Sequence, residues 1–365
     1  MICFNAVLLA QTINIEDIMT NLKAGNTAKA KEIADKAIIS ETYKNDPKTW
    51  FYRAITYHSI YESPSQSVKL LSKTPLFDAY EAYMKSFQLD QKKVLNTEII
   101  KALRIVSSQS VYEGIQYFNK ADYNTALSCF ENNITINRLP EVNQLDTIII
   151  YNAALSAEKA EKYPLAIDYY EQLIKLSFNG SKMYLDQALL YKKTGNESEY
   201  LKIIQNGMKA YPNDDVSLIS ELINHYLEKG NFEEAMVYIE KGLMREPTNP
   251  AFHFAKGSLF DQKGDLIVAE KEYKSALEFD PKYSDALFNL SVLYYNTATD
   301  LIKKAKSKDE QNKAFEWYQK SQPYLEKVHA QIPNDVQIMK MLKTVYTLLK
   351  QDDKLLEINK KLEKS

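Results

Sequence analysis

Small and aromatic residues recur at helical spacing in residues 250–283, in two successive stretches. They lie three or four positions apart, first at Gly257 and Phe260 and then at Ala269, Tyr273 and Ala276. This spacing places them on one face of each of two amphipathic helices. Small residues let two helices approach closely, and the aromatic side chains fill the space between neighbours. The pattern therefore predicts an antiparallel pair of helices.

Glycine and proline mark the same interval along the middle of the chain. The glycines lie at 195, 230 and 264, and a proline follows each of them seventeen residues later, at 212, 247 and 281. One pair follows the next after 35 and then 34 residues. A fixed period near this length, with helical patterns between the glycines and prolines, is typical of stacked helical hairpins.

The pattern extends over almost the whole chain. It predicts units at about 11–46, 47–92, 107–140, 147–180, 181–215, 216–249 and 250–283, then an elongated unit at 284–335 and a C-terminal capping hairpin at 336–365. In 181–215, Tyr200 stands where alanine is usual, which predicts looser packing. In the elongated unit we expect the first helix to continue through the polar stretch 303–313, and Pro323 to kink or interrupt the second helix.

Residues 250–283 closely resemble the tetratricopeptide repeat (TPR), whose pattern is W-x2-L-G-x2-Y…A-x3-F…P. The resemblance implies an all-α protein, a right-handed α-solenoid of antiparallel helix hairpins. It also implies a non-enzymatic scaffold or adaptor for protein–protein interaction. The elongated unit followed by a short charged cap is similar to exported bacterial TPR proteins. The alternative is a structural subunit of a cell-envelope assembly that docks through its outer face or its C-terminal helices.

The resemblance also implies where a partner binds. In TPR arrays the first helix of each unit lines the concave groove. Transferred by position, the groove residues are Phe51, Phe118, Tyr151, Leu185, Leu189, Lys192, Asn224, Phe254, Phe288 and Tyr295. Most of them are apolar or aromatic, so the expected partner is a peptide or helix of unknown identity with apolar anchors.

One known TPR partner class does not fit these positions. Repeats that bind the carboxylate tails of heat-shock chaperones combine lysine and asparagine at fixed places on successive first helices. Here Asn224 occupies one such place, but Ser220 and Ala255 stand at the positions before and after it in the clamp pattern. The sequence therefore argues against chaperone C-terminal tails as partners.

The charge balance points away from two other partner classes. The net charge is −2, from 46 basic and 48 acidic residues that are interspersed along the chain. Without a basic cluster, binding to nucleic acid has little electrostatic support. No segment has the roughly 20 consecutive apolar residues of a transmembrane helix.

Residue types that carry catalysis occur without a catalytic pattern. The cysteines, Cys3 and Cys129, form no C-x-x-C pair, and the four histidines form no H-E-x-x-H motif. Phosphate-binding glycine loops and G-x-S-x-G motifs do not occur either. The sequence therefore predicts no catalytic residues, no metal site and no cofactor, and Cys129 is expected to be a buried packing residue.

The first ten residues admit two interpretations. Residues 2–10 are apolar except for Asn5, which suggests the remnant of a signal peptide at 1–10 that lacks its basic start. The alternative is an ordinary N-terminal helix or strand. The first interpretation predicts a periplasmic or exported protein, and the second predicts a cytoplasmic one.

Overall fold

The computed structural model describes residues 13–363, and all of its regular elements are helices. The signal-peptide remnant expected at 1–10 lies outside these residues. The chain divides into two compact units, Met1–Ile203 and Ile204–Ser365, with the boundary inside helix α11 (Glu197–Ala210).

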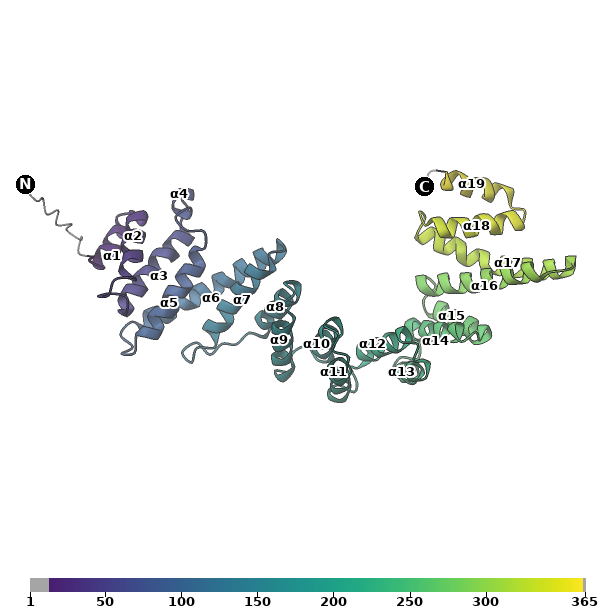
Figure 1. Ribbon diagram of the computed structural model, residues 1–365, viewed down its shortest axis with the longest axis horizontal. Helices are drawn as coiled ribbons and strands as arrows, with labels where there is room; N and C mark the ends of the chain where they lie inside the picture. The colour runs from purple at the N-terminus through teal and green to yellow at the C-terminus, as the bar shows by residue number, and fades with distance from the viewer. Residues whose placement is uncertain (1–12, 364–365) are drawn as a thin grey trace, which may run out of the picture. The chain divides into compact units, whose positions relative to one another are not determined.

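The first unit is a series of helical hairpins that follow one another in chain order (Figure 1). Its helices are α1 (Glu16–Lys23), α2 (Thr27–Ala37), α3 (Pro47–Glu62), α4 (Gln66–Lys69), α5 (Pro75–Leu89), α6 (Asn96–Asn119), α7 (Tyr123–Asn137), α8 (Thr147–Lys159), α9 (Tyr163–Lys175) and α10 (Ser181–Lys193). The second helix of each hairpin packs on the first helix of the next, as α5 does on α6 and α7 on α8.

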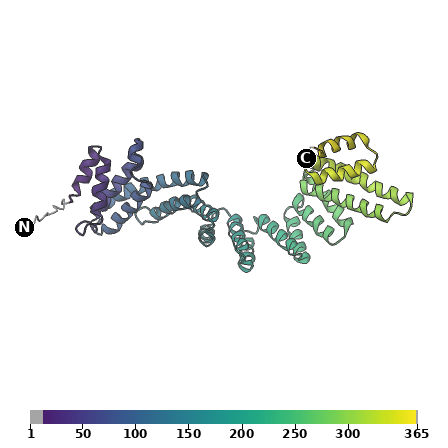
Figure 2. The ribbon, with the colours of Figure 1, turned by 45° about the horizontal axis from the view of Figure 1, so that its top comes forward.

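The second unit repeats this arrangement. Its helices are α12 (Val216–Glu228), α13 (Phe232–Arg245), α14 (Pro250–Gln262), α15 (Leu266–Phe279), α16 (Ser284–Lys304), α17 (Lys308–Gln331), α18 (Val336–Leu348) and α19 (Asp352–Leu362). The α16–α17 pair is longer than its neighbours and lies against the α18–α19 hairpin (Figure 2). Each unit is thus an all-α solenoid whose core is a row of small apolar clusters between successive helices.

Close helix contact depends on the small residues that the sequence pattern singled out. A Cβ atom at Gly257 in α14 would lie 2.6 Å from the ring of Tyr273 in α15. Gly114 in α6 has the same relation to Phe130 in α7, where the distance would be 2.7 Å. Ala269 and Ala276 are completely buried beside Tyr273. The small residues therefore create the space that the aromatic rings occupy.

Each short hairpin turn contains one residue in the left-handed conformation. Gly264 has φ of +80° between α14 and α15, and a Cβ atom there would have nothing within 4 Å. The next backbone N–H, of Asp265, donates to the carbonyl of Phe260 at 2.9 Å. This bond closes a Schellman-type helix end, a conformation that glycine adopts without strain.

Three hairpins make the same turn without glycine. Ala121, Glu161 and Lys350 have φ of 61°, 59° and 56° between their helices. The backbone bond is kept, since Asp122 N–H donates to the Tyr117 carbonyl at 3.0 Å. A side chain in this conformation costs about 1–2 kcal/mol relative to the right-handed region. These turns therefore carry local strain that the glycine turns avoid.

The elongated unit differs from the sequence expectation at the end of its first helix. Helix α16 was expected to continue through 303–313, but it ends at Lys304, and α17 begins at Lys308. Ser307 caps α17 by accepting a hydrogen bond from Glu310 N–H at 3.2 Å, and Glu310 lies at the third helical position, as in a capping box. Pro323 lies inside α17, which continues through it, so the proline does not end the helix.

Two further expectations concern helix length and burial. A first helix was expected from about residue 107, whereas α6 begins at Asn96 and covers residues that the sequence pattern left unassigned. Tyr200 was expected to mark loose packing, and its side chain is completely buried.

The turn residues give a reciprocal test of stability. Ala121→Gly should raise the free energy of unfolding by about 0.5–1 kcal/mol, because it removes left-handed strain. Gly264→Ala should lower it by a similar amount, since only backbone strain acts there. Urea unfolding of the full chain, followed by circular dichroism, measures both effects.

Ala160→Gly provides the matched control. Ala160 directly precedes the Glu161 turn but has φ of −81°, so glycine there should destabilise the protein. If Ala121→Gly and Ala160→Gly changed stability with the same sign, the strain attributed to Ala121 would not exist.

Candidate functional site

The first helices of the second unit form a continuous face. Helix α14 contacts both α12 and α16, each of which is also the first helix of its hairpin. Side chains on the exposed side of these helices are therefore neighbours across the repeats. This first-helix face, made by α12, α14 and α16, is where the TPR resemblance predicts a groove.

The structure places the four predicted groove residues of this unit in different environments. Phe254 is half-buried, with its ring centroid 5.8 Å from that of Tyr273 and 5.6 Å from that of Tyr283. Tyr295 is half-buried against Tyr318 of α17 at 5.4 Å. Asn224 is exposed, and Phe288 retains 39% of its accessible surface. Phe288 is therefore the open aromatic side chain among the four.

Most of the predicted groove residues of the first unit contact aromatic rings of neighbouring residues. Phe51 lies 5.9 Å from Tyr83, Phe118 lies 5.2 Å from Tyr123, and Tyr151 lies 5.9 Å from Phe178 (centroid distances). Leu185 and Lys192 are half-buried, and Lys192 Nζ lies 5.7 Å from the centre of the Tyr200 ring. Leu189 is exposed. Many of these side chains thus help to hold the hairpins together.

The sequence prediction missed two exposed apolar residues on α6. Ile105 and Tyr112 lie on one side of this helix with Ile115, at helical spacing, and all three are exposed. The predicted unit began at 107, so Ile105 was not compared with the repeat pattern, whereas Tyr112 lies inside the unit at a position that was not assigned to the groove. A run of apolar residues spaced for one helix face was the available signal.

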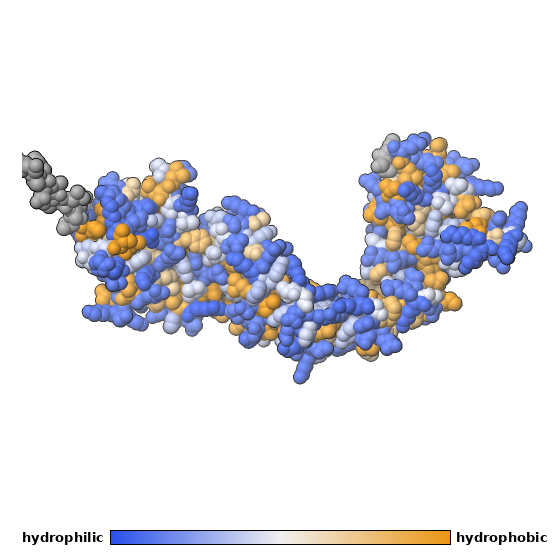
Figure 3. Space-filling view, in the orientation of Figure 1, coloured by the Kyte–Doolittle hydropathy of each residue, from blue (hydrophilic) through white to orange (hydrophobic). Residues whose placement is uncertain are grey.

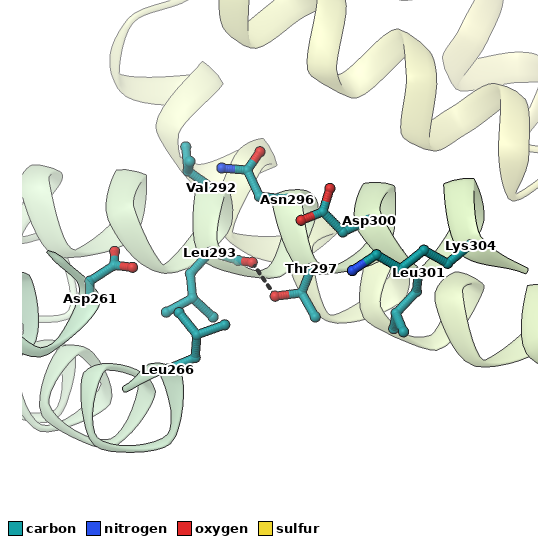
Figure 4. A pocket seen from close by; sticks show the side chains of 9 residues that line it. All are labelled: Asp261, Leu266, Val292, Leu293, Asn296, Thr297, Asp300, Leu301 and Lys304. Atoms are coloured by element: carbon teal, nitrogen blue, oxygen red, sulfur yellow. Dashed lines mark hydrogen bonds between the residues drawn. The ribbon is translucent and has the colours of Figure 1, made fainter. Parts of the chain in front are cut away.

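A cavity of about 400 Å³ lies where α16 continues past the α14–α15 turn, and its lining on α16 begins at Val292, one helical turn after Phe288. Asp261 at the end of α14 and Leu266 at the start of α15 form one side (Figure 4). The other side is formed by α16, through Val292, Leu293, Asn296, Thr297, Asp300, Leu301 and Lys304. The additional turns of α16 thus supply much of the lining.

A short hydrogen-bond chain connects α16 to α14 through Tyr273 of α15. Asn289 Nδ2 donates to the hydroxyl of Tyr273 at 3.2 Å, and that hydroxyl donates to Asp261 Oδ2 at 3.2 Å. Burial raises the pKa of the Asp261 carboxyl above its ordinary value, opposed by the hydrogen bond from Tyr273. The chain fixes Asp261 at the edge of the cavity.

Other ionisable groups are held in structural pairs. The buried Glu272 lies 2.8 Å from His253 Nδ1 and 3.3 Å from Lys256 Nζ. The buried Asp215 lies 3.3 Å from both Lys241 Nζ and Arg245 Nε. These contacts join α14 to α15 and the start of α12 to α13, and they explain the burial of both carboxylates.

Cys129 is buried in α7, where its surroundings raise the thiol pKa to about 12. The thiol is therefore protonated at neutral pH and unsuited to nucleophilic chemistry. Over residues 13–363, no three histidine, cysteine, aspartate or glutamate side chains are grouped as metal ligands. Within the same residues, no helix combines the length and apolar character needed to cross a membrane.

Comparison with known proteins supports the repeat pattern. The family model described as tetratricopeptide repeat matches residues 226–249 and 250–283, which include α13, α14 and α15. Among curated proteins, none matches this chain in sequence.

Several solved structures are similar over most of their own length. The C-terminal part of a TPR repeat-containing protein from Cytophaga hutchinsonii has 16% identity and a TM-score of 0.49, over 69% of this chain and 93% of that one. A TPR repeats protein from Bacteroides fragilis has 24% identity and a TM-score of 0.29, over 66% and 98%. YrrB, described as a TPR protein with an unusual peptide-binding site, has 13% identity and a TM-score of 0.37, over 57% and 98%.

Truncation of Phe254 and truncation of Phe288 should have different effects on the free energy of unfolding. Phe254→Ala removes a half-buried ring from two aromatic contacts and should lower the free energy of unfolding by about 1–3 kcal/mol. Phe288→Ala removes an exposed ring and should change it by less than about 0.5 kcal/mol. Urea unfolding of the two variants measures this; equal losses would mean that Phe288 is a packing residue.

Proposed function

We propose that this chain, whose residues 226–283 match the tetratricopeptide repeat model, is a non-enzymatic scaffold that binds a peptide or helix along a first-helix face. The observation that carries the proposal is the open Phe288, which lies one helical turn before Val292 of the cavity lining on α16. An exposed aromatic side chain and a partly apolar cavity on the same helix suit a binding hot spot.

The binding surface that we propose for each unit combines open and half-buried residues. In the second unit, Phe288 and Asn224 are accessible to a partner, and the half-buried Phe254 and Tyr295 would form groove walls. In the first unit, Leu189 is accessible, and the half-buried residues that would form walls are Phe51, Phe118, Tyr151, Leu185 and Lys192. Such walls cost little entropy on binding, because neighbouring rings already hold them.

A second candidate function has its own support. Second helices of the second unit also expose large apolar side chains, notably Val237 and Met244 on α13 and Ile267 on α15. In the space-filling view, apolar patches are separated by hydrophilic side chains on the visible surfaces of both units (Figure 3). An outer face of this kind would suit a structural subunit that docks in a larger assembly.

Selection of binding peptides distinguishes the two functions. We would pan a library of random 12-residue peptides against the full chain and measure the enriched peptides by calorimetry. Groove binding predicts a negative heat-capacity change, because apolar surface is buried. It also predicts that Phe288→Ala weakens binding by about 2 kcal/mol or more, as expected for an anchor.

Met244→Ala is the control, since Met244 is an apolar residue with 77% of its surface exposed on a second helix. Its binding should equal that of the unchanged chain. Loss of binding in Met244→Ala with none in Phe288→Ala would favour the outer-face function. A selection that enriches no peptide would contradict peptide binding by the groove.

A further inference from the structure

The cavity between α14 and α16 combines apolar walls with charged groups at its edge. Leu266, Val292 and Leu301 line it with aliphatic surface, and Leu293 is almost fully buried beneath them. Asp261 and Asp300 contribute carboxylates from two different helices (Figure 4). An occupant must therefore be apolar along its length and able to pair with a carboxylate.

Asp261 has capacity for a further donor. Among the residues that the structure describes, Tyr273 is the one hydrogen-bond donor to this carboxylate, and it contacts Oδ2. An ionised carboxylate accepts several hydrogen bonds through its two oxygens. An uncharged aliphatic occupant would remove water from Asp261 without replacing those bonds, which is unfavourable.

The lining of the cavity holds more carboxylates than ammonium groups. Asp300 is exposed, and its nearest ion-pair partner is Lys303 on the same helix, with a separation of 4.0 Å. Lys304 lines the outer end of the cavity, on the side formed by α16. The cavity lining thus holds two carboxylates and one ammonium group. Asp261 belongs to α14, whereas Asp300 and Lys304 both belong to α16 on the other side of the cavity.

We propose that this cavity receives an arginine side chain from the partner segment. Its methylene groups would contact Leu266, Val292 and Leu301, and its guanidinium group would bind Asp261. Arginine fits better than lysine because its planar group is weakly hydrated and offers five N–H donors, enough for a carboxylate and a neighbouring amide such as Asn296. The proposal rests on the proposed function, since it specifies what the partner carries at this point of the groove.

Two small probes test the cavity without a partner. n-Butylguanidinium reproduces the arginine side chain, and n-butylurea has the same shape without the charge. Each is titrated into the full chain labelled at leucine and valine methyl groups, and NMR follows Leu266, Val292 and Leu301. n-Butylguanidinium should shift these methyl signals saturably and bind at least about tenfold more tightly than n-butylurea, equivalent to about 1.4 kcal/mol.

Substitutions that remove a negative charge and one that removes a positive charge should change probe binding in opposite directions. Asp261→Asn should weaken n-butylguanidinium binding about tenfold, or about 1.4 kcal/mol, and Asp300→Asn should weaken it less, because Asp300 is solvated. Lys304→Ala should tighten binding by removing a like charge. Met244→Ala, outside the cavity, should leave it unchanged. If Asp261→Asn does not fold, Asp300→Asn and Lys304→Ala still test the charge dependence, because both residues are exposed.

Equal binding of the two probes, no binding of either, or no effect of these charge substitutions would overturn the proposal. The probe titration and the peptide selection fail independently. Enriched peptides without arginine, combined with indifference to the guanidinium probe, would leave groove binding in place and remove the arginine site. Binding of n-butylguanidinium without enriched peptides would leave the guanidinium-binding cavity in place and remove peptide binding by the groove.

Discussion

One left-handed residue between two helices is the constraint on which the hairpins with short turns depend. It reverses the chain within a few residues, and the backbone bond from Asp265 to Phe260 fixes the reversal. The two helices then lie antiparallel, and small residues such as Gly257 let them approach until an aromatic ring fills the gap. Because each hairpin packs mainly on its neighbours, stability accumulates locally along each unit.

The same constraint decides how much of the fold the sequence could predict. Where the turn residue is Gly195, Gly230 or Gly264, the repeat frame was visible from the spacing alone. Where the turn uses Ala121, Glu161 or Lys350, the residue type does not indicate a left-handed conformation. These residues adopt it at the cost of local strain. Those hairpins were found through their apolar pattern instead, which locates a helix but not its ends.

Helix ends were the main source of error, for identifiable physical reasons. The break between α16 and α17 depends on Ser307 and Glu310, a capping pair hidden in a polar stretch without glycine or proline. The early start of α6 depends on three turns of helix that no repeat pattern required. These features concern the candidate site directly. The extended end of α16 forms much of the cavity, and the early part of α6 carries the exposed Ile105.

The candidate site was predictable in position but only partly in composition. The first-helix frame identified Phe288, which is open, and Phe254, which is largely occupied by contacts with Tyr273 and Tyr283. Sequence spacing could not separate the two, because both are aromatic residues at equivalent kinds of position. Their difference arises from the neighbouring hairpin, since Tyr283 precedes α16 and closes over Phe254 alone.

The central claim is that a partner lies on the first-helix face of the second unit. Its most direct test replaces Phe288, and separately Met244, with the photo-reactive residue p-benzoylphenylalanine in cells that produce the protein naturally. The account predicts that irradiation links the same partner to position 288 repeatedly, with that link mapped to a short partner segment, and links nothing specific to position 244. Cross-linking at 244 with none at 288 would contradict it.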